Sequence, residues 1–146
     1  DVIRRLEEIA PVIAVAGNRE TPEIKEGYPW ITAVQFEDVR IALTHQILPL
    51  NLPKILPTSQ DWVKGLGVDG VQALVYGHTH EPENRRMGNI LYFNPGFAGP
   101  FREEPVRTVG MLKIDASDIS GRIYFLTPPP RPEYLDKASF WSSRNK

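Results

Sequence analysis

Four short apolar runs in this chain each end in glycine, asparagine or histidine. They read VIAVAGN (12–18), IALTH (41–45), LVYGHTH (74–80) and YFNPG (92–96). Runs this short and this apolar are typical of strands buried on both faces, as in a parallel sheet. Because α/β folds build their sites at the carboxyl edge of the sheet, we expect the polar ends to gather there. The pattern predicts a mixed α/β fold with one site.

All three histidines of the chain, His45, His78 and His80, follow such runs. Neutral imidazole is the commonest protein ligand for transition metals, and a strand end holds its backbone still. The His-x-His pair alone is weak evidence for a metal site, since surface histidines or one hydrogen-bonded core histidine would explain it equally well. The asparagine at the end of another run, Asn18, can offer an amide oxygen to the same metal, although an asparagine there is usually a turn residue. Together these residues favour a metal-assisted hydrolase.

Composition narrows the class of protein. The chain has 146 residues, enough for one domain, and its 41% hydrophobic and 24% charged residues are ordinary for a globular protein. A net charge of −1 gives no footprint for nucleic acid or a membrane surface, and no apolar stretch is long enough for a membrane span. The lack of cysteine excludes disulfides and thiolate metal sites and fits a reducing compartment, so we predict a cytoplasmic location.

Other segments fill in the organisation. Apolar residues at helical spacing predict an amphipathic helix over 3–10, ended by Pro11, and the segment 31–45 predicts a hairpin that turns near residues 37 and 38. We expect an irregular loop over 46–58, a short helix over 58–67, and strands over 72–77, 89–94, 108–115 and 121–127. The predicted domain covers 1–126, and 127–146 forms a proline-rich C-terminal tail.

The order of the motifs GN-x-[DE], TH, GHTH and NPG resembles the calcineurin-like metallophosphoesterase superfamily. It is most similar to the small single-domain phosphodiesterase branch, and the resemblance runs from about Val2 to Phe125. It implies a four-layer α/β/β/α sandwich of the metallophosphoesterase type, lacking its first strands in this chain.

The resemblance also implies roles for individual residues. The implied metal ligands are Asn18, His45 and His78 for the second metal and His80 for the first. Asn94 and Gly96 belong to the NPG turn that closes the site, where we predict substrate binding. Arg19 follows the ligand asparagine, and we predict that this catalytic residue binds a phosphate oxygen.

The implied reaction is phosphodiester hydrolysis by a metal-bridging hydroxide in the complete protein. Two divalent metal ions take part, and histidine, asparagine and carboxylate ligands suit manganese, iron, nickel or zinc. The expected partner is a small phosphoester substrate. We expect no binding to nucleic acid or to a membrane, and a homo-oligomer is possible.

The chain departs from the family pattern in several places. The Asp-x-His and Gly-Asp motifs of the family's first two strands are absent, so this chain holds at most one well-formed metal site. Arg19 stands where many relatives have histidine or cysteine, Gln46 replaces the glycine of the family's THG motif, and Phe97 replaces a serine.

Two explanations of the missing motifs remain. In one, the sequence is a fragment, which the start at Asp1 inside a helix supports. In the other, the chain has lost two-metal catalysis and is a catalytically inactive scaffold or protein-binding module on a phosphoesterase fold. A retromer subunit of the same superfamily is a precedent for such a role.

Overall fold

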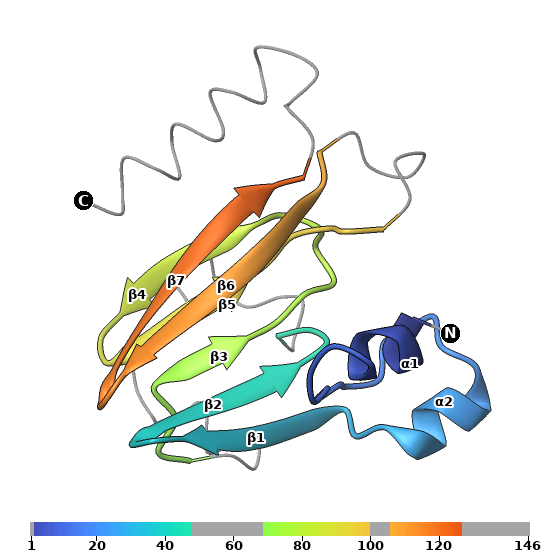
Figure 1. Cartoon of the computed structure of the whole chain (residues 1–146), viewed down its shortest axis with the longest axis horizontal. Coiled ribbons are helices and arrows are strands. Elements are labelled where there is room, and N and C mark those ends of the chain that lie inside the picture. The colour runs from blue at the N-terminus through green and yellow to red at the C-terminus, as the bar shows by residue number, and fades with distance from the viewer. Residues whose placement is uncertain (1, 48–68, 100–105, 127–146) are drawn as a thin grey trace.

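The computed structural model describes residues 2–47, 69–99 and 106–126. Within these ranges the chain forms two short helices and seven strands, arranged in two sheets (Figure 1). The helices are α1 (Val2–Glu7) and α2 (Pro22–Gly27), and the strands are β1 (Ile31–Phe36), β2 (Val39–Thr44), β3 (Ala73–Val75), β4 (Glu83–Met87), β5 (Ile90–Asn94), β6 (Thr108–Asp115) and β7 (Asp118–Phe125). None of the described helices has the length and apolar character needed to cross a membrane.

The larger sheet has the strand order β1-β2-β3-β5-β4. Its three central strands, β2, β3 and β5, pair in parallel, while β1 and β4 pair antiparallel at the two edges. The carboxyl ends of the central strands therefore lie at one edge of the sheet, as the apolar runs predict.

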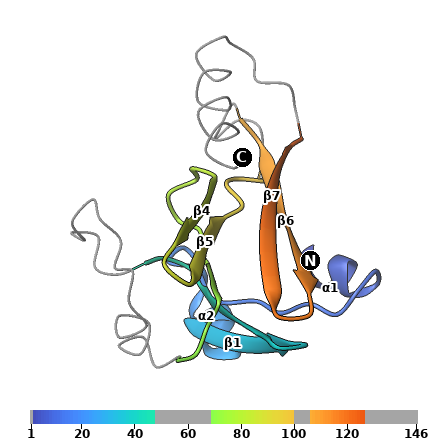
Figure 2. The same ribbon diagram turned by 90° about the vertical axis from the view of Figure 1, so that its left-hand side faces the viewer.

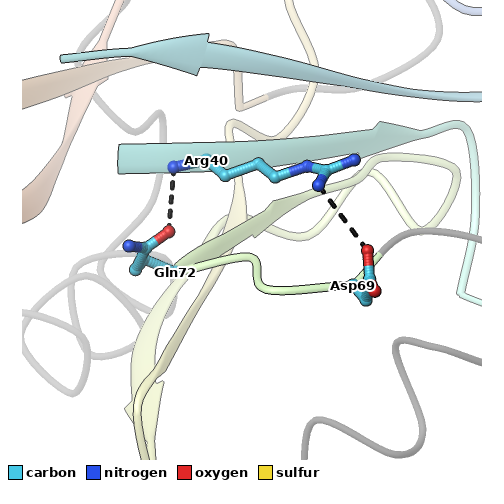
Figure 3. Close-up of polar contacts among 3 residues, drawn as sticks. All are labelled: Arg40, Asp69 and Gln72. Carbon is cyan, nitrogen blue, oxygen red and sulfur yellow. Dashed lines mark hydrogen bonds and ion pairs between the residues drawn. The ribbon is translucent and has the colours of Figure 1, made fainter. Parts of the chain in front are cut away.

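A side chain fixes where β3 begins against β2. Gln72, just before β3, accepts a hydrogen bond at Oε1 from the Arg40 backbone N–H (2.8 Å) and donates from Nε2 to the Asp38 carbonyl (3.0 Å). Its own N–H donates to the Arg40 carbonyl at 2.9 Å. The Arg40 guanidinium also lies 3.6 Å from the Asp69 carboxylate (Figure 3). Because a slip of one residue would break this set, Gln72 helps to hold the register that aligns the two strand ends.

The β6–β7 hairpin forms a second layer against one face of the large sheet (Figure 2). Ile119 packs there with apolar side chains of the central strands, among them Ile41, Leu91 and Phe93. Gly110 and Gly121 lie directly over the Phe93 ring, and a Cβ on either glycine would overlap that ring. The two glycines therefore let the hairpin approach the sheet closely.

The opposite face of the large sheet carries a second buried cluster. Its buried members are Ala42, Val71, Leu74, Tyr76, Ile90 and Tyr92. Side chains on both faces of the central strands are buried, as expected for a parallel sheet.

Two expectations about individual elements were wrong, and one strand was not expected at all. Residues 12–18 form no strand, and the Ala16 N–H donates to the Pro29 carbonyl (2.9 Å) outside any ladder. Strand β4 was not expected, because its sequence, ENRRM, is polar. Helix α1 ends at Glu7 rather than continuing to residue 10, and it buries no residue of its own.

The other expected elements are found or lie outside the described residues. The hairpin turns at Glu37 and Asp38, with Glu37 in the left-handed region (φ 51°), and the strands predicted near 72–77, 89–94, 108–115 and 121–127 all form. The expectations for most of the loop 46–58, for the helix over 58–67 and for the tail 127–146 fall outside the described residues.

Candidate metal centre

Three predicted ligands come together at the carboxyl edge of the sheet. Nε2 of His45 lies 2.9 Å from Oδ1 of Asn18 and 3.1 Å from Nδ1 of His78. The two imidazole rings meet edge to face, with centroids 5.1 Å apart and an interplanar angle of 79°. The predicted convergence of these residues, called the ligand trio below, is confirmed by the geometry.

Each member of the trio is positioned by the backbone that precedes it. His45 directly follows the last residue of β2, and His78 lies three residues beyond the last residue of β3. The Gly77 N–H donates to the His45 carbonyl at 3.0 Å, which ties the two strand exits together. Asn18 follows the buried Gly17, where a Cβ would come within 3.5 Å of the His45 ring and 3.3 Å of the Glu20 carboxylate.

The loop that carries the GHTH motif has an unusual backbone. His78 and His80 both have positive φ angles, 73° and 61°, in the left-handed region that side chains other than glycine seldom adopt. Such a conformation persists only where surrounding contacts hold it, and it is concentrated at functional sites. The backbone alone therefore marks residues 77–82 as a candidate functional loop.

The electrostatics around His45 favour its neutral imidazole. Partial burial lowers the pKa of His45 below its ordinary 6.5, and the neighbouring His78 and His80 lower it further, while the Glu20 carboxylate acts in the opposite direction. A neutral ring can offer a lone pair to a metal. To use Nε2 as a ligand atom, His45 must carry its remaining proton on Nδ1.

The donor set fits one divalent transition-metal ion. Ligand bonds of about 2.0–2.2 Å at right angles put neighbouring donor atoms roughly 3 Å apart, which is the spacing found around His45 Nε2. Two imidazoles and an amide oxygen suit manganese, iron, nickel or zinc. Within the described ranges, no three His, Cys, Asp or Glu side chains gather closely enough to hold a metal ion, so the trio reaches three donors only through the amide oxygen of Asn18.

The other predicted site residues either follow a member of the trio closely in the chain or lie at the end of β5, where Asn94 contacts the loop that carries His78. The ring of His80 stacks on Phe97 with centroids 4.5 Å apart, and Arg19 is exposed in the turn after Asn18. Asn94 is fully buried at the end of β5, and the N–H of Gly96 donates to its side chain. The roles of these residues stay predictions: binding of the first metal by His80, catalysis by Arg19, and substrate binding by Asn94 and Gly96.

Sequence reasoning missed a polar cluster that borders the loop. The Tyr76 hydroxyl donates to the Glu83 carboxylate, and Nε of Arg85 lies 2.8 Å from Oε1 of the same carboxylate in an ion pair. Burial raises the pKa of Glu83 above its ordinary 4.5, although Arg85 opposes the shift. A sequence signal for this cluster does exist. Gly88-Asn89 is a typical hairpin turn sequence and stands directly before the clear strand at 90–94, so it indicates a partner strand over the polar residues that precede it.

Comparison with known sequences bears out the resemblance. The model of the calcineurin-like phosphoesterase superfamily domain matches residues 1–117. Phosphodiesterase YfcE from Escherichia coli (strain K12) is 37% identical over 127 residues, which cover 81% of this chain and 61% of that protein. A probable metallophosphoesterase from Methanothermobacter thermautotrophicus is 30% identical over 132 residues, which cover 84% of this chain and 67% of that protein. The chain thus spans about 61% of the length of YfcE.

Comparison with solved structures bears out the predicted fold. The crystal structure of wild-type Vps29 complexed with Zn²⁺ from Entamoeba histolytica superposes with a TM-score of 0.60 and 25% sequence identity, covering 84% of this chain and 67% of that one. The predicted fold class, an α/β sandwich of the metallophosphoesterase type, is therefore confirmed.

Proposed function

The chain belongs to the calcineurin-like phosphoesterase superfamily, and from this premise we propose that the protein is a metal-dependent hydrolase of phosphodiesters. The observation that carries the proposal is the ligand trio, whose donor atoms lie 2.9 and 3.1 Å apart. Three elements far apart in the sequence supply these atoms. Their meeting at one point supports a shared metal ion, since amide oxygen and imidazole nitrogen are both metal ligands.

The residues of this chain have distinct parts in the proposed reaction. The trio would hold one divalent ion, with His80 directed to a second, and Arg19 would bind a phosphate oxygen through its guanidinium. When bound, divalent ions supply an activated water and offset the negative charge of the phosphoryl group. The neutral state of His45, which its lowered pKa favours, keeps a lone pair available.

The test is hydrolysis of bis-p-nitrophenyl phosphate by the complete protein. We expect turnover with manganese, loss of turnover after treatment with a chelator, and recovery when Mn²⁺, Ni²⁺ or Zn²⁺ is added back. Comparing the diester with p-nitrophenyl phosphate separates a diesterase from a monoesterase. A complete protein that stays inert with each of these metals would rule out the proposed activity.

A second candidate function is a metal-binding scaffold that does not hydrolyse phosphoesters. It is favoured by the similarity to Vps29 in a zinc-bound form, and by the trio, which offers donors for one ion only. The two functions differ in a simple measurement, because a scaffold would bind Zn²⁺ at the trio and show no turnover. A small phosphoester substrate, a cytoplasmic location and the assembly state remain predictions.

A further inference from the structure

We propose that Asn94 is a positioning residue that sets the shape of the GHTH loop and thereby aims the His78 imidazole at the trio. The proposal rests on the proposed function in that the aimed ring is taken to be a metal ligand. It differs from a role in substrate binding, because Asn94 would act through the loop.

The buried amide of Asn94 is fully engaged with protein groups. Its exposed fraction is 0%. Nδ2 donates to Oγ1 of Thr79 at 3.0 Å and to the carbonyl of Gly77 at 3.4 Å. Oδ1 accepts from the N–H of Gly96 at 2.9 Å. One side chain therefore joins the end of β5, the turn after it and the GHTH loop.

The contacts of Asn94 bracket the histidine that needs positioning. Gly77 and Thr79 are the two neighbours of His78, so Asn94 holds the chain on both sides of the left-handed residue (φ 73°). Backbone dihedrals of this kind are not self-sustaining for histidine. Without the two donated bonds, the loop is free to return to ordinary dihedrals, which would swing the ring away from His45.

Gly77 also reaches the second histidine of the trio, through its other peptide group. The carbonyl of Gly77 accepts from Asn94, and its N–H donates to the carbonyl of His45. The side-chain hydrogen bond between Tyr76 and Glu83 holds the two sides of the loop together. Asn94 is thus the buried centre of a hydrogen-bond set that relates both imidazoles to each other.

The test compares three single variants of the complete protein. Asn94→Asp keeps the acceptor for the Gly96 N–H and removes the Nδ2 donor. Thr79→Val removes the acceptor on the loop, and Thr79→Ser keeps it, which makes the serine variant the matched control. The probe is Co²⁺ alone, titrated into apoprotein and followed by its visible absorption. Thermal melts establish that each variant is folded.

We expect Asn94→Asp and Thr79→Val to weaken Co²⁺ binding by about 10- to 100-fold, and Thr79→Ser to bind like the wild type. A role confined to stability would lower the melting temperature and leave the Co²⁺ affinity of the folded protein unchanged, which would overturn the proposal. If Asn94→Asp fails to fold, comparing the Co²⁺ affinities of Thr79→Val and Thr79→Ser tests the proposal in the same way.

A metal-free readout separates this proposal from the proposed function. The Cε1–H NMR signals of His45 and His78 report their ring contact in the apoprotein, and we expect both to shift in Asn94→Asp and Thr79→Val. Unshifted signals would overturn the positioning role. A wild-type protein that binds no Co²⁺ would instead remove the metal-dependent function, while the NMR comparison would still decide what Asn94 does.

Discussion

Nε2 of His45 lies 3.1 Å from Nδ1 of His78, although 33 positions separate the two residues in the chain. They meet because β2 and β3 are parallel neighbours, with Leu43 paired to Val75, so that both strands end at the same edge of the sheet. The contact is therefore a direct product of the topology.

Removing one member of the trio should weaken metal binding strongly. We expect His45→Ala to weaken Co²⁺ affinity by at least about 100-fold and to reduce phosphodiester hydrolysis in proportion, because the ring is the central donor of the three. Isothermal titration with the metal alone measures the first effect.

His80→Ala is the comparison for this variant. Its ring stacks on Phe97, so we expect its loss to leave Co²⁺ binding at the trio within a few-fold of wild type. Equal loss of affinity in both variants would mean that His80 shares the same ion, contrary to the arrangement proposed above.

The lowered pKa of His45 predicts a pH dependence of stability. Between the lowered value in the folded state and 6.5 in the unfolded state, the unfolded chain binds more protons, so stability rises with pH through this window and falls as pH drops below 6.5. Metal-free wild type should therefore lose melting temperature relative to His45→Asn on acidification over about pH 8 to 5. A difference between the two proteins that is constant across this range would contradict the assignment.

Glu83 should show the opposite dependence. Burial raises its folded pKa above the ordinary 4.5, so the folded protein binds more protons in the window above 4.5 and this residue's contribution falls as pH rises through it. Glu83→Gln cannot ionise, yet its amide oxygen can still accept from Tyr76. We therefore compare the melting temperature of the variant with that of wild type, and expect the difference, variant minus wild type, to increase with pH above 4.5. Loss of the Arg85 ion pair adds a constant offset that does not change this trend. A decrease over the same pH range would exclude the assigned shift.

The glycines under the second layer should not tolerate a side chain. Gly110→Ala or Gly121→Ala would force a methyl group into the buried Phe93 ring, and we expect each to cost about 1–3 kcal/mol of unfolding free energy. Gly27→Ala is the matched control, because a Cβ there meets nothing within 4 Å. Urea denaturation of the three variants measures the differences, and equal stability of all three would show that the hairpin does not approach the sheet as closely as described.

The sequence contained most of what determines the sheet and the trio. The runs 41–45, 74–80 and 92–96 are apolar because their strands are covered on two faces, and burial of this kind leaves a direct trace in composition. The polar residues at their ends are close in space because parallel strands align their carboxyl ends.

Two elements could not be predicted because their structure depends on partners. Residues 12–18 are as apolar as the central strands, yet none of the described strands pairs with them. Strand β4 is polar, but its backbone pairs along five residues with β5. Apolar content reports burial and says little about which ladder a segment joins.

The positioning of the GHTH loop was likewise hidden from sequence. The family resemblance gave Asn94 a place beside the substrate, while its total burial and its bonds to Gly77 and Thr79 emerge only in three dimensions. Such contacts join residues 15 and 17 positions apart, a distance at which no local pattern exists.

The left-handed backbone at His78 and His80 lowers the stability of the fold, while the proposed function requires histidine at both positions. Each such residue costs about 1–3 kcal/mol, and glycine would adopt the same dihedrals almost without cost. Selection for thermal stability alone would therefore favour glycine at both positions, and the two imidazoles would be lost. Engineering this protein for durability should leave this loop untouched and seek its gains on the far side of the sheet.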